Sequence, residues 1–259
     1  MKIPIYQIDA FTSHVFAGNP AAVCPLPSWL DDTTLQAIAA ENNLSETAFF
    51  VGGDGEYHLR WFTPVQEVDL CGHATLASGH VILGFLEPSR QAVAFYTKSG
   101  RLDVTREGDL LALDFPAREG EPCEAPPELV AALGRPPREV FRSRDYMAVY
   151  DSEEDVRSLR PDMARLMDLD ALGVIATAAG RDADFVSRFF APMAGIPEDP
   201  VTGSAHCTLI PYWSKRLARS RLRALQVSPR GGELFCEDRG DRVVIAGRAV
   251  KYLEGTIEV

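Results

Sequence analysis

The chain has 259 residues, of which 46% are hydrophobic and 24% charged, values typical of a globular enzyme or binding protein. Its 26 basic and 37 acidic side chains give a net charge of -11, which repels phosphate backbones and anionic membrane surfaces, so nucleic acid is not an expected partner. No apolar run is long enough to span a bilayer and no signal-peptide core precedes the first acidic residue, so we expect a cytoplasmic protein with no membrane partner.

The first third of the chain mixes strand and helix signals. In chain order, a strand is predicted at 3–10, a helix at 31–42 with its cap at Asp31 or Asp32, a strand at 44–51 and a second strand at 57–62. The glycines of segment 51–56 lie between two strand patterns rather than between a strand and a helix. They therefore predict a hairpin turn and do not favour a nucleotide-binding loop.

Residues 60–83 and 188–210 share one order of features. In each copy a strand ends at a proline, an acidic loop follows, and an apolar helix begins at a glycine. That glycine is Gly72 in the first copy and Gly203 in the second. A repeat of this kind predicts two similar halves that each contain strands and helices.

Six prolines between residues 114 and 137 predict the boundary between the halves. We expect an N-terminal half at 1–113 and a C-terminal half at 114–249, with a final strand at 250–259 that returns to the N-terminal half. The acidic segment 151–170 is predicted to be a solvated helix that takes no part in the chemistry.

The repeated glycines suggest a ligand site. A glycine at a helix entrance lets a ligand approach the backbone closely, and the unpaired amides of the first turn attract an anion. We expect the entrances at Gly72 and Gly203 to face one another across a cleft that binds a small carboxylate. The alternative is that Thr202 or Ser204 simply caps its helix.

Four side chains near these entrances could move protons. Strand alternation puts Glu46 on an apolar face, where burial disfavours the charged form of a carboxyl group and suits it to general acid/base work, unless it is exposed at the strand end. His73 lies at a helix N-terminus, which favours its neutral form, although a single histidine is more often structural. Asp199 could accept a proton or orient His73, or only form a turn. Cys71 could be a thiolate with a lowered pKa, or a small buried residue.

Five segments, taken in order, carry a family resemblance. They are Phe16-Ala17-Gly18-Asn19-Pro20-Ala21-Ala22-Val23, Asn43-Leu44-Ser45-Glu46-Thr47-Ala48-Phe49, Leu70-Cys71-Gly72-His73-Ala74-Thr75, Glu198-Asp199-Pro200-Val201-Thr202-Gly203-Ser204-Ala205, and Gln226-Val227-Ser228-Pro229-Arg230-Gly231-Gly232. Together they resemble the PhzF family of phenazine-biosynthesis isomerase-like proteins. The resemblance implies the α+β fold of diaminopimelate epimerase, with two similar domains that each curl a mixed β-sheet around a central helix.

The resemblance also implies a function and a set of site residues. It implies a cofactor-independent, metal-free isomerase that moves a proton on a small carboxylate-bearing substrate in the cleft between its domains, and that forms a homodimer. By position, Glu46 is the expected acid/base. The residues expected to complete the catalytic set are His73, Asp199 and Ser204, and those expected to contact the substrate are Asn19, Gly72, Gly203 and Cys71.

The chain departs from the phenazine-forming enzyme at Cys71-Gly72-His73-Ala74, where that enzyme has Ala-Gly-His-Pro, so a different substrate is expected. Cys71 also raises the alternative of a cysteine-dependent epimerase or racemase. Such enzymes use two opposed thiols, but the repeat counterpart of Cys71 is Thr202, and Cys207 lies inside the predicted helix. A binding protein without catalysis is a third possibility, which the carboxylates near the site disfavour. The five scattered cysteines contain no C-x-x-C pair and predict neither disulfides nor a zinc site.

Overall fold

The structure is a computed structural model that describes residues 1–259 as two compact units. Unit 1 comprises Met1–Phe115 and Ile245–Val259, and unit 2 comprises Pro116–Val244. The sequence-based division into domains at 1–113 with 250–259 and at 114–249 stays a prediction. Among the helices, none combines the length and the apolar character needed to cross a membrane.

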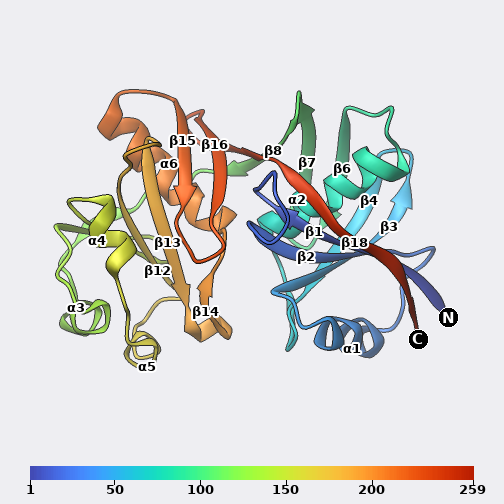
Figure 1. Ribbon diagram of the computed structural model, residues 1–259, viewed down its shortest axis with the longest axis horizontal. Coiled ribbons are helices and arrows are strands. Elements are labelled where there is room, and N and C mark those ends of the chain that lie inside the picture. The colour runs from blue at the N-terminus through green and yellow to red at the C-terminus, as the bar shows by residue number, and fades with distance from the viewer. The chain divides into compact units, whose positions relative to one another are not determined.

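Unit 1 is built around one buried helix. Its elements are β1 (Lys2–Ala10), β2 (Asn19–Pro25), α1 (Asp32–Asn42), β3 (Glu46–Gly53), β4 (Glu56–Phe62), β5 (Glu67–Val68), α2 (Gly72–Val81), the π-helix η1 (Ile82–Leu86), β6 (Ala92–Thr97), β7 (Gly100–Glu107), β8 (Leu110–Pro116) and β18 (Ala249–Glu258). Strand β18, drawn in red in Figure 1, pairs antiparallel with β1 along its whole length. The expected return of the C-terminal strand to the first half is confirmed.

Unit 2 has the same kinds of element. They are β9 (Glu121–Cys123), α3 (Pro127–Leu133), β10 (Glu139–Arg142), β11 (Tyr146–Val149), α4 (Glu153–Ser158), α5 (Met163–Leu166), β12 (Val174–Ala179), β13 (Phe185–Ala191), the short 3-10 helix η2 (Pro192–Ala194), β14 (Ile196–Asp199), α6 (Gly203–Leu217), β15 (Arg221–Gln226) and β16 (Gly232–Asp238). Strand β17 (Arg242–Gly247) follows and runs past the last residue of the unit.

Strand pairing repeats between the units. In unit 1, β2 is parallel to β3, β3 is antiparallel to β4, β4 is antiparallel to β5 and parallel to β6, and β6 is antiparallel to β7. In unit 2, β11, β12, β13, β14, β15 and β16 pair in the same order with the same directions. Helix α2 lies between β5 and β6 in the chain, and α6 lies between β14 and β15. The predicted α+β fold with two similar halves is confirmed.

Helix α2 owes its central place to small and apolar residues. It contacts β1, β2, β3, β7 and β18, and Figure 1 shows it among the strands of unit 1. Gly79 lets the helix approach β7, because a Cβ at this position would lie 2.7 Å from Cγ1 of Val104. A helix whose side chains are nearly all buried cannot display the polar face of an ordinary surface helix.

Local signals in unit 1 fold as predicted. The side chain of Asp31 accepts a hydrogen bond from the amide of Thr34 and caps α1. Asp54 and Gly55 join β3 to β4 with φ angles of 56° and 79°, the left-handed pair that a two-residue hairpin turn requires. The hairpin prediction is therefore confirmed.

The prediction of one solvated helix over 151–170 is wrong. The segment forms the short helices α4 and α5, and Val156 and Leu166 from these helices lie in the hydrophobic core of unit 2. Helix α4 ends before Pro161, since the residue before a proline is disfavoured in helical conformation. The many charged residues of this segment suggested a solvated helix, although its few apolar residues pack into the core.

Candidate functional site

Glu46 and His73 form a buried pair in unit 1. Glu46 is the first residue of β3, and His73 is the second residue of α2. Oε2 of Glu46 lies 3.1 Å from Nε2 of His73, and the two residues are only 9% and 4% exposed. Because a strand end and a helix start fix their backbones, the carboxylate and the imidazole are held together by the fold itself.

Asn19 and Cys71 contact the other side of the His73 ring. Nδ2 of Asn19, at the start of β2, lies 3.1 Å from Nδ1, and Sγ of Cys71 lies 3.5 Å from the same nitrogen. A neutral ring that accepts from Nδ2 of Asn19 carries its proton on Nε2, facing Glu46, whereas a protonated ring donates from both nitrogens and requires the amide oxygen of Asn19 to face Nδ1. In either state the Nε2 proton faces the carboxylate of Glu46.

The expected neutral preference of His73 is wrong. Burial alone would lower the pKa of its imidazole, but the charges and hydrogen bonds of Cys71 and Glu46 raise that pKa well above its usual value. The pKa of the Cys71 thiol is itself raised to about 11, so this thiol is neutral near pH 7. Glu46 is therefore the neighbour whose charge stabilises the imidazolium. The pairing with a carboxylate outweighs the helix dipole, whose effect is about 1 kcal/mol or less.

Cys71 does not have the properties of an activated thiolate. It is the N-cap residue of α2, its side chain makes no capping hydrogen bond, and the residue is 6% exposed. Burial, and after it the charge of Glu46, raises the pKa of its thiol to about 11. The lowered pKa considered for a nucleophile or base is therefore wrong for Cys71, which is a buried thiol at neutral pH.

A hydrogen-bond network holds the loop before α6 in unit 2. The hydroxyl of Thr202 donates to the carboxylate of Asp199, which is 8% exposed. The side chain of Gln226 accepts from the amide of Thr202 at 2.8 Å and donates to the carbonyl of Asp199 at 2.8 Å. Thr202 makes no side-chain capping bond, so the alternative that it simply caps the helix is wrong. Gln226 is not among the predicted site residues, although it lies in one of the family-like segments.

Ser204 is the repeat counterpart of His73 and is half-buried. Its Oγ accepts a hydrogen bond from Nη2 of Arg144 at 3.1 Å. The same Arg144 nitrogen donates to Asp145, which is only 2% exposed. A guanidinium and a hydroxyl thus meet at the entrance of α6, beside the buried Gly203. The sequence analysis gave no sign of Arg144.

An arginine–glutamate pair precedes the helix entrance in both units. In unit 1, Arg60 of β4 binds both carboxylate oxygens of Glu67 in β5, at 2.7 and 2.9 Å. In unit 2, Arg188 of β13 binds both oxygens of Glu198 in β14 at 2.8 Å. Each pair ties the loop before the helix to the preceding strand. The two arginines begin the repeated strand motif, so the repeat itself was the signal that could have identified these pairs.

Each helix also hydrogen-bonds back to its own N-cap residue. The hydroxyl of Thr75 donates to the carbonyl of Cys71 at 2.5 Å, and Nδ1 of His206 lies 2.8 Å from the carbonyl of Thr202. Burial lowers the pKa of His206 to about 4, so its ring is neutral at pH 7 and donates from Nδ1. His206 is therefore a structural histidine.

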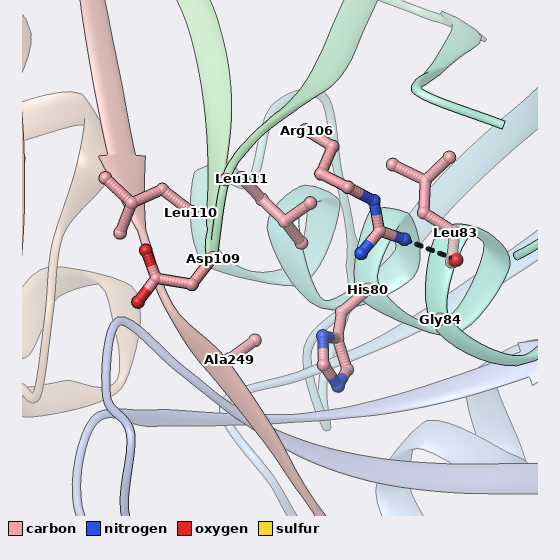
Figure 2. Close-up of a pocket in the computed structure, with 9 residues that line it drawn as sticks. His80, Leu83, Gly84, Arg106, Asp109, Leu110, Leu111 and Ala249 are labelled. Atoms are coloured by element: carbon pink, nitrogen blue, oxygen red, sulfur yellow. Dashed lines mark hydrogen bonds between the residues drawn. The ribbon is translucent and has the colours of Figure 1, made fainter. Parts of the chain in front are cut away.

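A cavity of about 100 Å³ lies at the other end of α2 (Figure 2) and includes none of the predicted site residues. Arg106 points into this region and donates to the carbonyl of Leu83 in η1 at 2.5 Å. Burial and the charges of Arg106 and Lys251 lower the pKa of the neighbouring His80 to about 4. With no histidine that titrates near neutrality, this cavity is a poor candidate for acid/base chemistry.

The comparisons with known proteins identify the family of the chain. The sequence profile of the family described as phenazine biosynthesis-like proteins, PhzC–PhzF, matches residues 8–255. A Pseudomonas aeruginosa protein named an uncharacterized isomerase is 55% identical over the full length of both chains. The chain belongs to the PhzF family.

Solved structures extend the PhzF assignment to the fold. A PhzF-family crystal structure from Enterococcus faecalis superposes with a TM-score of 0.97 at 48% identity over all of both chains. A hydroxyproline epimerase from Agrobacterium vitis matches 99% of this chain and 92% of its own with a TM-score of 0.61 at 10% identity. At that identity the likeness shows the fold alone. This chain therefore has the epimerase-like fold that the family resemblance implied.

Proposed function

We propose that this PhzF-family chain is a cofactor-independent isomerase that moves a proton on a small carboxylate-bearing substrate. The observation that carries the proposal is the buried contact between Oε2 of Glu46 and Nε2 of His73 at 3.1 Å. A carboxylate that is largely shielded from water and oriented by an imidazole suits a general acid/base. The names of the curated relatives, which include uncharacterized isomerases, support the reaction class.

In the proposed reaction, Glu46 removes a proton from a carbon of the substrate and returns it to another carbon of the same conjugated system. The substrate is neither oxidised nor reduced, and the carboxyl group of Glu46 ends in its starting state. His73 donates from Nε2 to the Glu46 carboxylate before the first transfer and after the second, and it holds the carboxyl group in place while Glu46 carries the proton. Asn19 contacts Nδ1, the other ring nitrogen, and thereby holds the ring with Nε2 toward Glu46.

The residues at the entrance of α6 are proposed to bind the substrate. Ser204 accepts from Arg144, which leaves its own hydroxyl hydrogen to donate to a substrate carboxylate. Thr202 and Gln226 fix the carboxylate and carbonyl of Asp199, which suits it to a fixed polar contact. The partnership of Asp199 with His73, the joint cleft, anion binding at Gly72 and Gly203, and the homodimer all stay predictions.

The test measures solvent-deuterium exchange into candidate substrates by NMR. A panel of anthranilate-like and amino-acid-derived carboxylic acids is incubated with the protein in deuterated water. Glu46→Gln keeps the size of the side chain but cannot accept a proton near pH 7, so exchange should fall by a factor of roughly 10² to 10⁴. Glu41→Gln, on the exposed side of α1, is the matched control and should exchange like the parent.

Cys71→Ala separates the proposed chemistry from a thiol mechanism. A buried thiol with a pKa raised to about 11 should be dispensable for proton removal, so this variant should retain most of the exchange activity. Circular dichroism checks that each variant is folded. Loss of exchange in Cys71→Ala, with exchange retained in Glu46→Gln, would refute the assignment of Glu46 and favour cysteine-dependent chemistry.

A further inference from the structure

Three chemically different metal ligands meet in unit 1. The carboxylate of Glu46, the thiol of Cys71 and a ring nitrogen of His73 all lie within 4.8 Å of one another. Nε2 of His73 is 3.1 Å from Oε2 of Glu46 and 4.0 Å from Sγ of Cys71. With bond lengths of about 2.0–2.3 Å, tetrahedral zinc places its ligand atoms roughly 3.3–3.6 Å apart. Because the three ligand atoms lie within 4.8 Å of one another, shifts of about 1 Å would convert the cluster into a zinc site.

The fold holds these ligands in place. Glu46 starts β3, and Cys71 and His73 flank the first residue of α2, so none of the three is carried by a long surface loop. Asn19 contacts the remaining ring nitrogen of His73. A zinc-bound histidine usually hydrogen-bonds an outer group through its second nitrogen, and the amide of Asn19 can supply the acceptor by turning over. The surroundings of a zinc-bound His73 are therefore already built.

The ligand chemistry selects the ion. Mg²⁺ and Ca²⁺ prefer sites made of oxygen ligands, whereas a sulfur, a nitrogen and an oxygen together suit Zn²⁺. Three protein ligands also leave a fourth position open for water. We propose that Glu46, Cys71 and His73 form a three-ligand Zn²⁺ site, and that the bound ion inhibits the enzyme.

The inhibitory part rests on the proposed function, because zinc would bind the carboxylate of Glu46 that takes the proton and the ring nitrogen of His73 that faces this carboxylate. Binding releases to solvent the proton of the Cys71 thiol and the proton on Nε2 of His73, since the thiolate and the unprotonated ring nitrogen are the ligands. The ion has no role in turnover. It is a reversible blocker of the proton-transfer pair.

Metal binding can be tested without any activity assay. Zn²⁺ affinity is measured by competition with a chromophoric chelator, and Co²⁺ is used as a spectroscopic substitute. The parent should bind one Zn²⁺ per chain, and its Co²⁺ form should show the charge-transfer absorption of a cobalt–thiolate bond. Cys71→Ser should weaken Zn²⁺ binding by a factor of about 100 or more and abolish that absorption. Cys123→Ser, which changes the exposed cysteine, is the matched control.

Two results would overturn the site. One is a Co²⁺ spectrum of the parent chain that lacks thiolate absorption. This measurement needs no variant, so misfolding of a variant cannot affect it. The other is Zn²⁺ binding that survives in Cys71→Ser but is lost in Cys123→Ser.

Inhibition is tested separately by adding Zn²⁺ to the deuterium-exchange assay. Exchange should stop at saturating zinc and resume when a chelator is added. Exchange that continues in a chain shown spectroscopically to hold the ion would overturn the inhibitory part while the site stands. A chain that exchanges deuterium but binds no zinc would overturn the site while the proposed function stands.

Discussion

The paired arginine–glutamate contacts allow a matched prediction within one chain. In unit 2, Arg188 and Glu198 have side chains that are only 9% and 14% exposed. Arg188 also donates to the carbonyl of Leu159 at 2.9 Å. Glu198→Gln would leave this buried guanidinium without a counter-charge and would turn an amide NH₂ toward its own donors. We expect a loss of about 3 kcal/mol in the free energy of unfolding, at the lower end of values for broken buried pairs.

The equivalent change in unit 1 should cost less. Arg60 is 20% exposed and keeps a second carboxylate partner, Asp32, at 2.9 Å when Glu67 is replaced. Because water still solvates the guanidinium of Arg60 and Asp32 still pairs with it, Glu67→Gln should lower the free energy of unfolding by about 1 kcal/mol. The difference of about 2 kcal/mol between the two variants therefore measures the combined effect of the deeper burial of Arg188 and of the second carboxylate partner of Arg60.

Urea unfolding followed by circular dichroism measures both losses, and hydrogen exchange at the amides of β13 and β4 assigns each loss to its unit. The activity assay is not needed. Equal losses in the two variants, or a loss below about 1 kcal/mol in Glu198→Gln, would refute the argument that the burial of Arg188 controls the energy.

Three further predictions test other contacts. Thr202→Val removes the hydroxyl that Asp199 and Gln226 share and should cost about 1–2 kcal/mol in urea unfolding, whereas Thr202→Ser should cost much less; equal losses would contradict the role of the hydroxyl. The folded-state pKa of His206 is about 4, so as the pH falls below about 6.5 the unfolded chain binds a proton at this histidine before the folded chain does. The free energy of unfolding should therefore drop by roughly 3 kcal/mol between pH 6.5 and pH 4. His206→Gln should remove this part of the pH dependence measured by urea unfolding, and an unchanged pH dependence in the variant would contradict the assignment to His206. Gly79→Ala should cost about 1–3 kcal/mol in the free energy of unfolding, because the new Cβ would clash with Val104. Adding Val104→Ala to this variant should restore part of its melting temperature, and no recovery would show that the clash is not the cause.

Local chemistry explains which parts of the fold the sequence could predict. The cap at Asp31 and the turn at Asp54 and Gly55 depend on a few adjacent residues, and both form as expected. The repeat predicted two similar halves, since each glycine-led helix follows the same strand and loop. In segment 151–170 the reasoning failed, because apolar contacts with residues far away in the chain decide which short helices form there.

Site chemistry depended more on tertiary structure. The sequence indicated that Glu46, His73, Asn19 and Cys71 belong to one site, and the structure brings these four together in unit 1. The sequence could not give the direction of the pKa shifts of His73 and Cys71. At each group, burial and the neighbouring charges and hydrogen bonds shift the pKa in opposing directions, and their balance depends on the tertiary structure.

By itself, the sequence determined the family and the repeated α+β architecture, because both depend on residue types and their spacing, whereas the role of Glu46 as proton carrier is implied by the family resemblance and stays a prediction. Only the tertiary structure decided that Thr202 serves Asp199 rather than its helix, and that a carboxylate, a thiol and an imidazole from separate segments come within reach of a single ion. Hydrogen-bond partners and coordination distances depend on where strands and helices meet, and that meeting is set by packing across the whole unit.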